Sequence, residues 1–415
     1  MRDEMKKVPR LRFRGFQEDW ELCKLKEITE RVKGNDGRMD LPTLTISAGQ
    51  GWLNQKDRFS GNIAGKEQKN YTLLLKNELS YNHGNSKLAK YGAVFSLKTY
   101  EEALVPRVYH SFKSTKNSDP DFLEYIFATK KPDKELGKLV SSGARMDGLL
   151  NINYDDFSNI KINIPHVHEQ KKISNLLRKI DNTITLHQRK LEQLKELKKA
   201  YLQLMFVPTN TKNNKVPKLR FANFEGNWEQ CKLIDLATTY IGLVTTMTTN
   251  YTDQGTLLIR NSDIKEGKFD LNNPIYLKEE FAKQNENRSM KMGDVVTVHT
   301  GDIGTSAVIT EDLDGTIGFA TITTRPSKKL NSNYLCWYFN SNIHKKYAKR
   351  MSTGDGRSNY NMKDFNKNIL VIPKIEEQQT IGIFFQNLDN TITLHQNKLD
   401  QLKSLKKSYL QNMFI

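Results

Sequence analysis

The most regular pattern of apolar and polar positions in the chain lies between Glu169 and Phe206. This stretch contains no glycine or proline and is rich in Leu, Lys, Gln and Glu. Its apolar positions recur at steps of three and four residues, the heptad spacing of a helix that packs along a partner helix. The spacing predicts one long helix with a seam formed by Ile173, Leu177, Ile180, Ile184, His187, Leu191, Leu194, Lys198, Tyr201 and Met205.

The same spacing returns near the end of the sequence. Both seams contain a histidine and a lysine, and polar residues at such positions commonly fix the register at some cost in stability. We interpret His187 and His395 as tolerated seam residues rather than as ligands. The tripeptide Asp181-Asn182-Thr183 indicates a break, or a new N-cap, inside the first helix. The second seam is formed by Ile381, Phe385, Leu388, Ile392, His395, Leu399, Leu402, Lys406, Tyr409 and Met413.

These helices belong to a unit that occurs twice. The octapeptide that begins at Asp181 returns unchanged 208 residues later. At the same offset, residues 164–206 and 372–414 share 26 of 43 identities, and residues 8–28 and 216–236 share 11 of 21. A repeat of this period is a duplicated domain rather than a solenoid repeat. Such a chain can carry a pseudo-two-fold axis, which would pair the two helices antiparallel.

Between the shared blocks lie two variable segments, 29–163 and 237–371, which are equal in length but nearly unrelated in sequence. Each has the character of mixed α/β structure with short strands, such as those predicted at Thr256–Ile259 and Asp294–Val298. Whole segments have diverged while their frame has not. This pattern favours a shared scaffold that carries two interchangeable recognition domains, the reading heads, which correspond to the two variable segments. The other interpretation is that one copy has lost its function.

The polar loops of the variable segments carry the residue types that read base edges or grip phosphates. Loops of this composition are also typical of any protein surface. The candidate DNA-binding residues are Asn82, His83, Ser86, Lys87, Arg107 and Arg145 in the first segment, and Arg260, Asn261, His299, Thr300, Arg357, Ser358 and Asn359 in the second.

Composition narrows the class of protein. The chain has 415 residues, enough for two or more cored domains, and 64 basic against 47 acidic residues give a net charge of +17. This balance favours a polyanionic partner, with nucleic acid first, although ribosome-associated and membrane-surface proteins share it. The three cysteines are few and odd in number, as in reduced cytosolic proteins, so we expect a cytoplasmic location. No apolar run approaches the length of a membrane span, and the N-terminus does not resemble a signal peptide.

No arrangement of catalytic or metal-binding residues is legible. The pair His166-x-His168 of one copy is replaced by Lys374-x-Glu376 in the other, and no further ligands complete a metal site. A Ser-His-Asp or Cys-His arrangement is not apparent, nor is a carboxylate cluster with nuclease spacing. The sequence therefore predicts a binding protein rather than an enzyme, without a metal or cofactor of its own. An enzyme that carries its own nuclease or methyltransferase site is the disfavoured alternative.

The order of motifs resembles the specificity subunit of Type I restriction–modification enzymes. Each copy begins with a Pro-x-Leu-Arg-Phe segment and a tryptophan, continues through a variable domain, and ends with an Ile-Pro-x-x-x-Glu-Gln helix start. The helix-start motif is fairly specific because it is doubled, and the resemblance covers essentially the whole chain. Its matching positions are Ile164-Pro165, Glu169-Gln170, Ile372-Pro373 and Glu377-Gln378.

The resemblance implies two target-recognition domains, each of which reads one half of a bipartite double-stranded DNA sequence. It also implies two modification (methyltransferase) subunits, which bind S-adenosylmethionine, and restriction subunits, which use ATP and magnesium. The helices would set the spacer between half-sites and dock the methyltransferase subunits. The seam residues that we expect to pair these helices are Ile184, His187, Leu191, Leu194, Lys198, Tyr201, Ile392, His395, Leu399, Leu402, Lys406 and Tyr409.

We therefore expect an α+β fold with two mixed α/β recognition domains separated by two long antiparallel coiled-coil helices. The alternative function is a duplicated basic adaptor without sequence specificity, for example on RNA. The scattered aromatic residues of the loops disfavour that alternative, because single-strand binders usually cluster aromatics as stacking platforms. The predicted boundaries are 1–163 for the first recognition domain, 164–206 for the first helical spacer, 207–371 for the linker and second recognition domain, and 372–415 for the second spacer.

Overall fold

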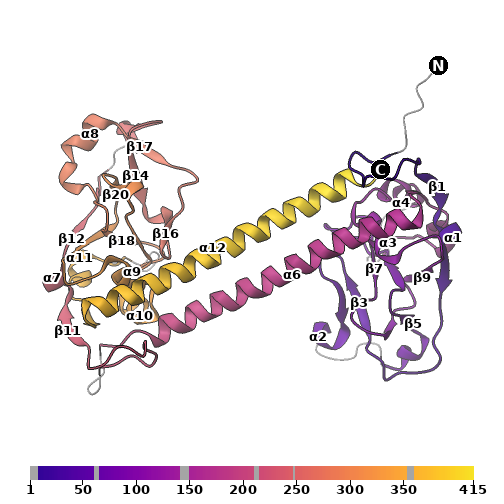
Figure 1. Cartoon of the computed structure of the whole chain (residues 1–415), viewed down its shortest axis with the longest axis horizontal. Coiled ribbons are helices and arrows are strands. Elements are labelled where there is room, and N and C mark those ends of the chain that lie inside the picture. Colours follow the sequence, from indigo (N-terminus) through magenta and orange to yellow (C-terminus); the bar gives the residue numbers. More distant parts are fainter. Residues whose placement is uncertain (1–7, 60–64, 141–148, 210–214, 246–247, 353–358) are drawn as a thin grey trace. The chain divides into compact units, whose positions relative to one another are not determined.

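The computed structural model of the chain (Figure 1) divides into two compact units. Unit 1 comprises residues 1–186 and 398–415, and unit 2 comprises residues 187–397. Each unit therefore combines one variable segment with pieces of both long helices. The structure describes residues 8–59, 65–140, 149–209, 215–245, 248–352 and 359–415.

The long helices α6 (Val167–Leu204) and α12 (Ile375–Asn412) each contain 38 residues, as the heptad spacing predicts. The predicted break at Asp181-Asn182-Thr183 is wrong, because α6 runs through it without interruption. The Thr183 hydroxyl donates to the carbonyl oxygen of Lys179 at 2.8 Å. A hydroxyl that bonds back one turn in this way is satisfied within the helix, so it does not cap a new one.

A two-stranded ribbon stands at the base of each variable segment. In unit 1, β1 (Glu21–Lys24) pairs antiparallel with β10 (Lys161–Ile164), so that Glu21 lies opposite Ile164. In unit 2, β11 (Glu229–Lys232) pairs with β22 (Ile369–Ile372), and Glu229 lies opposite Ile372. The two registers match at the repeat offset. The ribbons therefore close each variable segment at its two ends in the same way.

Unit 1 contains a four-stranded antiparallel sheet in the order β2-β9-β6-β7 and two separate antiparallel pairs, β3-β4 and β5-β8. Its strands are β2 (Thr29–Val32), β3 (Leu44–Ser47), β4 (Gly51–Asn54), β5 (Thr72–Leu75), β6 (Leu79–Asn82), β7 (Ala93–Ser96), β8 (Glu102–Val105) and β9 (His110–Ser114). Its shorter helices are α1 (Leu25–Ile28), α2 (Gln55–Phe59), α3 (Pro120–Ala128), α4 (Asp133–Leu139) and α5 (Tyr154–Ser158).

Unit 2 contains a sheet in the order β12-β21-β18-β19 and a second sheet, β13-β17-β14-β20, in which β14 and β20 run parallel. Its strands are β12 (Ala237–Ile241), β13 (Tyr251–Thr252), β14 (Thr256–Arg260), β15 (Ile264–Lys265), β16 (Lys268–Phe269), β17 (Ile275–Leu277), β18 (Val295–Thr297), β19 (Ser306–Val308), β20 (Ile317–Phe319) and β21 (Ile322–Pro326). Its shorter helices are α7 (Leu233–Leu236), α8 (Glu279–Gln284), α9 (Ser332–Asn340), α10 (Asn342–Met351) and α11 (Met362–Phe365).

The four-stranded sheets of the two units have corresponding connectivity, although their sequences have diverged. In each sheet the strand that follows the ribbon lies at one edge, next to the last strand of the sheet, and a hairpin completes the other side. Strands β6 and β18 thus occupy the same place. The variable segments are versions of one domain, which supports the interpretation of two related reading heads.

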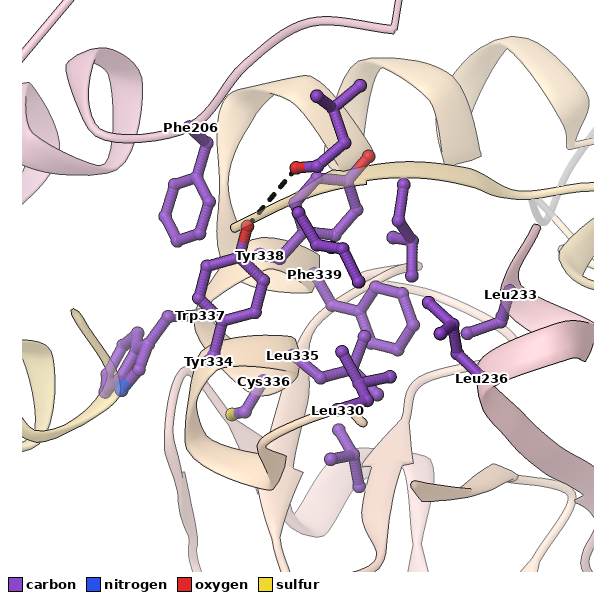
Figure 2. Packing of buried hydrophobic residues seen from close by; sticks show 14 of the residues in the cluster. Phe206, Leu233, Leu236, Leu330, Tyr334, Leu335, Cys336, Trp337, Tyr338 and Phe339 are labelled. Atoms are coloured by element: carbon purple, nitrogen blue, oxygen red, sulfur yellow. Dashed lines mark hydrogen bonds between the residues drawn. The ribbon is translucent and has the colours of Figure 1, made fainter. Parts of the chain in front are cut away.

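The core of unit 2 includes the end of the helix that leaves the first variable segment. Figure 2 shows Phe206 beside the tyrosines of α9, with Leu233 and Leu236 of α7 on the other side of the cluster. The ring centroid of Phe206 lies 5.5 Å from that of Tyr334 and 5.8 Å from that of Phe385 in α12. Phe206 is 2% exposed. The residues at the end of the first helix therefore form part of the core of unit 2.

The core of unit 1 contains the equivalent residues from the end of the second helix. Met413 and Phe414 are buried in it, and the ring of Phe414 lies 5.2 Å from that of Phe122. A backbone hydrogen bond joins the amide of Leu11 to the carbonyl oxygen of Asn412 at 2.9 Å. Its counterpart in unit 2 joins Leu219 to Leu204 at 3.0 Å. The end of each long helix is thus held against the Pro-x-Leu-Arg-Phe segment of the other copy.

Candidate nucleic-acid interface

The doubled Glu-Gln motif forms a buried ion pair at the start of each long helix. Arg12 donates two hydrogen bonds to the carboxylate of Glu169, both at 2.8 Å, and Arg220 donates two to Glu377 at 2.8 and 2.7 Å. The glutamates are only 1% and 2% exposed. The hydrogen bond to the carboxylate raises the pKa of each arginine. This bidentate geometry fastens the Leu-Arg-Phe segment to the helix start.

The glutamine of the motif holds the variable segment to the same helix. The Gln170 side chain accepts from the amide of Asp119, the N-cap of α3, at 3.0 Å and donates to the carbonyl oxygen of Pro165 at 2.8 Å. Gln378 makes the same contacts with Asn331, the N-cap of α9, and with Pro373, both at 2.9 Å. The motif therefore fixes the start of each long helix to a shorter helix of the adjacent variable segment, α3 in unit 1 and α9 in unit 2.

The long helices are joined by two equivalent ion pairs. Lys198 bonds to Asp389 at 2.5 Å within unit 2, and Lys406 bonds to Asp181 at 2.6 Å within unit 1. In unit 2 the Nδ1 atoms of His187 and His395 lie 3.0 Å apart. Contacts that pair increasing positions in one helix with decreasing positions in the other define an antiparallel pair, as predicted. None of the predicted seam residues is exposed.

A hollow of about 410 Å³ opens on unit 1 beside the end of β6. Three predicted residues, Asn82, Ser86 and Lys87, line it. Arg58, from α2, also lines it, although no periodicity or motif singles out this residue. The hollow thus combines two cationic side chains with amide and hydroxyl groups, a set suited to phosphates and base edges. Arg107 is exposed and is not among the lining residues.

His83, which was predicted to bind DNA, lies beneath this surface instead. Its side chain is 5% exposed, and its ring nitrogens face the carbonyl oxygens of Leu150 and Val108. The ring cannot reach a ligand while it makes these contacts. In this structure the ring of His83 is therefore not available for DNA contact, although its place in a polar loop predicts an exposed side chain.

In unit 2 several predicted residues come together at the end of β18. The Asn261 amide accepts from the backbone of His299 at 2.8 Å and donates to the carbonyl oxygen of Ala320 at 3.0 Å. His299 contacts the Thr300 hydroxyl at 2.9 Å, and burial lowers the pKa of its imidazole. Thr300 forms a β-bridge with Asn359. The loops that carry these residues are thus joined at one end of the sheet.

Arg260 is held within its own loop. It donates to both carboxylate oxygens of Asp263 at 2.9 and 2.7 Å and to the carbonyl oxygen of Asn273 at 2.8 Å. Its guanidinium charge is neutralised locally, so phosphate binding by Arg260 would require this pair to open. The predicted residues Arg145, Arg357 and Ser358 lie outside the described residues. The remaining assignments of DNA contact stay predictions.

The residues that the structure describes contain no group of three or more His, Cys, Asp or Glu side chains able to hold a metal ion. Burial raises the pKa of Cys23 to about 11 and that of Cys336 to about 12. These thiols are therefore protonated near neutral pH and are weak nucleophiles. Within the same described ranges, no helix is long and apolar enough to cross a membrane.

The fold and the repeated frame define the class of protein to which the chain belongs. The family model of the Type I restriction modification DNA specificity domain matches it twice, over residues 17–196 and 225–404. The chain therefore belongs to the family of Type I restriction–modification specificity subunits. The alternative of a nonspecific adaptor finds no support in these matches.

Individual relatives agree with this assignment. The chain is 22% identical over 293 residues to the Type I restriction enzyme MjaVIII specificity subunit of Methanocaldococcus jannaschii, covering 69% of this chain and 68% of that protein. It is also 22% identical over 407 residues to the putative type I restriction enzyme MjaX specificity subunit of the same organism, covering 95% and 92%. The crystal structure of a Type-I restriction-modification system S subunit from M. genitalium has a TM-score of 0.61 at 12% identity, with 98% and 99% coverage. That structural likeness shows the fold alone.

Proposed function

We propose that each variable segment reads one half of a bipartite double-stranded DNA target. The observation that carries this proposal is the pair of heads, which have the same sheet connectivity and the same ribbon register but different loops. When two surfaces bind chemically similar but distinct partners, we expect the two domains to keep the same scaffold and to differ in their loops. Two segments of one DNA duplex are such partners, and the net charge of +17 suits them.

In unit 1 the proposed reading surface is the hollow beside β6. Arg58 and Lys87 would neutralise phosphates, which supplies affinity, while Asn82 and Ser86 face the same space with groups that can bond to base edges. In unit 2 the proposed surface comprises Asn261, His299, Thr300 and Asn359. Further candidates for DNA contact are Arg107 and Arg145 in the first variable segment, and Arg357 and Ser358 in the second.

The proposed chain is a recognition subunit without catalysis of its own. Methylation would be performed by two modification subunits that bind S-adenosylmethionine, and cleavage by restriction subunits that use ATP and magnesium. The antiparallel helices would dock the modification subunits and set the length of the unread spacer. We propose a cytoplasmic location for the assembled complex, since the DNA and the other subunits would be there.

Exchange of one head tests the proposal directly. Residues 29–163 are replaced by the corresponding segment of a relative, and the methylated motif is mapped across the genome. We expect one half-site to change and the other to stay the same. The matched control replaces residues 237–371, which should change the other half only. If each exchange altered both halves, the model of independent heads would be wrong.

Single substitutions test the proposed surface of unit 1. Arg58→Ala and Lys87→Ala should each weaken DNA binding and reduce the slope of log affinity against log salt by about one, the loss of one phosphate contact. Lys116→Ala removes an exposed lysine that does not line the hollow and serves as the control. Equal effects at all three positions would point to the overall charge instead of this surface.

A further inference from the structure

Helix α10 of unit 2 has one buried face and one basic face. His344 and Ala348 are buried against the core of the unit. On the opposite side, Lys346, Lys349 and Arg350 are exposed. These three positions are three and four residues apart, so their side chains lie beside one another on the helix surface. We call these three residues the basic row.

The charges of the basic row are not neutralised by neighbouring carboxylates. In the part of the chain that the structure describes, none of its three side chains forms an ion pair. The nearby acidic residues have other partners, because Glu266 bonds to Lys345 at 2.6 Å and Asp364 bonds to Lys367 at 2.7 Å. The last two residues of the row also complement the dipole at the end of the helix. Lys346 lies in the middle of the helix, where that effect is absent.

The basic row belongs to a helix that contacts the proposed reading surface of unit 2. The loop that follows Thr300 packs directly on α10. A Cβ atom added to Gly304 in this loop would lie 3.4 Å from the Cβ atom of Ala348 and 3.3 Å from the ring of His344. Thr300 in turn forms the β-bridge with Asn359. The helix therefore supports the loops that carry the candidate DNA contacts.

Tyr360 connects the same loops to the basic row. Its amide donates to the carbonyl oxygen of His299 at 2.9 Å, and its hydroxyl lies 3.4 Å from Nε2 of His344. Its ring lies edge-on to that of Tyr347, with the centroids 6.4 Å apart. The guanidinium carbon of Arg350 lies 5.7 Å from the centroid of the Tyr347 ring. A continuous series of contacts thus joins the row to the reading surface.

Helix α4 of unit 1 provides an internal comparison. It follows α3 as α10 follows α9, and the Glu-Gln motif holds α3 and α9 in the same way. The charges of α4 are balanced, since Lys134 and Lys138 are accompanied by Asp133 and Glu135, and Lys138 bonds to Glu135. Helix α10 contains four basic residues and no acidic one. Corresponding helices of the two units therefore differ in charge.

The chemistry of the basic row suits the phosphate backbone of duplex DNA better than it suits a protein. Protein interfaces are depleted in lysine and depend on apolar or aromatic anchors. The exposed residues of α10 are Asn342 and the basic row, which offer no such anchor. A duplex carries one negative charge per about 1.7 Å of its axis, and contacts to phosphates position a protein without reading the sequence.

We propose that the basic row binds DNA phosphates beside the half-site that unit 2 reads, so that unit 2 anchors the chain on the duplex more strongly than unit 1. This proposal rests on the proposed function of unit 2, which brings DNA to the adjoining loops. The row supplies affinity and position, whereas the loops supply the sequence preference. Binding through unit 2 is therefore the more sensitive to salt.

Removal of the three charges tests the row in the complex with the modification subunits. The triple variant Lys346→Gln, Lys349→Gln and Arg350→Gln keeps polar side chains of similar helix propensity. Each lost phosphate contact should lower the slope of log affinity against log salt by about 0.9, and three contacts by about 2.7. Between about 50 and 200 mM salt, the wild type should thus lose about fortyfold more affinity than the variant, on target and unrelated duplexes alike.

Two control variants separate the row from overall charge and from folding. Lys131→Gln, Lys134→Gln and Lys138→Gln together remove the same charge from exposed lysines in and before α4, and should lower the slope by less than about one. Lys346→Arg with Lys349→Arg keeps the charges and should bind as the wild type does. Equal losses in the two triple variants would assign the effect to net charge and overturn the proposal.

Ethylation of single phosphates locates the contacts on the duplex. The phosphates whose ethylation blocks binding of the wild type, but not of the row variant, should lie beside the half-site that exchange of residues 237–371 changes. Contacts elsewhere, an unchanged salt slope, or loss of assembly with the modification subunits in the row variant would each overturn the proposal. A complex that binds DNA without a preferred motif would refute the proposed function, while the salt slope would still decide whether the row binds phosphates.

Discussion

Glu377 shows how a single buried charge depends on its partner. Its carboxylate is 2% exposed and is bonded at both oxygens by Arg220. Replacement of Glu377 by Gln leaves the guanidinium, itself largely buried, without a counter-charge. We expect unit 2 to lose about 2–3 kcal/mol of stability. The rate at which a thiol reagent labels the buried Cys336 under native conditions reports the opening of unit 2.

The double variant Arg220→Met with Glu377→Gln provides the control for this pair. Removal of both charges is far less costly than removal of one, because no buried ion is left unpaired. The double variant should therefore recover much of the lost protection of Cys336. An additive loss in the double variant would show that the ion pair is not the cause.

His344 predicts a dependence of stability on pH. It is buried in the core of unit 2, and burial lowers its pKa from 6.5 to about 4. The unfolded chain therefore binds a proton over a pH range in which the folded chain does not. Stability is complete above pH 6.5 and is lost as the pH falls towards 4. Between about pH 7 and pH 5, the loss from this residue should be about 2 kcal/mol.

Labelling of Cys336 at each pH, compared between the wild type and His344→Gln, measures this contribution. Comparison at equal pH removes the intrinsic dependence of the thiol reaction. The difference in stability between the two chains should shrink as the solution is acidified. His168→Gln, which changes an exposed histidine, should leave the profile unaltered. A constant difference would mean that His344 does not resist protonation.

Residue types alone predicted only part of the candidate site. The polar loop at the end of β6 was found from its composition, and Asn82, Ser86 and Lys87 do share a hollow. The burial of His83 could not be predicted, because composition does not show that a ring points inward at two carbonyl groups. Arg58 was missed because it comes from α2, and only the fold brings that helix to the hollow.

At the scale of the elements, the long helices were the most predictable part of the fold. Their signal is local, since a seam at heptad spacing needs no knowledge of the rest of the chain. The strands are short, and most pair with residues far away in sequence, so their order could not be read from periodicity. The ribbon between β1 and β10 illustrates this, because Cys23 lies opposite Ile162.

The two ion pairs between the helices consist of the same residue types but differ in burial. Lys198 and Asp389 have side chains 11% and 15% exposed, whereas Lys406 and Asp181 are 29% and 33% exposed. Asp389→Asn should therefore destabilise the helix pair in unit 2 by about 1–3 kcal/mol. Asp181→Asn, the matched variant in unit 1, should cost less than about 1 kcal/mol, because solvent screens the pair.

Hydrogen exchange of peptides from α6 and α12 measures both effects in one molecule. Peptides of unit 2 should exchange faster in Asp389→Asn, and peptides of unit 1 should change little in Asp181→Asn. Raising the salt concentration should reduce the smaller effect further. Equal losses at the two positions would contradict the assignment of the difference to burial.

At the scale of the whole molecule, the helix ends complete cores that lie in other parts of the sequence. Phe414 is 2% exposed in the core of unit 1, as Phe206 is in that of unit 2. Phe414→Ala should destabilise unit 1 by about 3–5 kcal/mol, the usual loss for a large buried ring. Hydrogen exchange should increase in α3, whose Phe122 contacts Phe414.

Phe206→Ala is the matched control at the equivalent position of the repeat. It should loosen α9 in unit 2 and leave α3 protected, because Phe206 contacts Tyr334 and not Phe122. In the complex, the two variants should weaken recognition of opposite half-sites. If Phe414→Ala affected unit 2 instead, the assignment of the helix ends to their cores would be wrong.

The burial of Phe414 in the core of unit 1 also bears on the order in which the chain folds during synthesis. The core around Phe122 is made early, but it stays incomplete until Phe414 has been added nearly three hundred residues later. At about 5–20 residues per second, that interval is on the order of 15–60 s. Throughout it, the apolar surface that Phe414 covers is open to water and to other nascent chains. The first head to be translated therefore cannot be finished before the second is made, and this delay is where we expect a chaperone to be needed most.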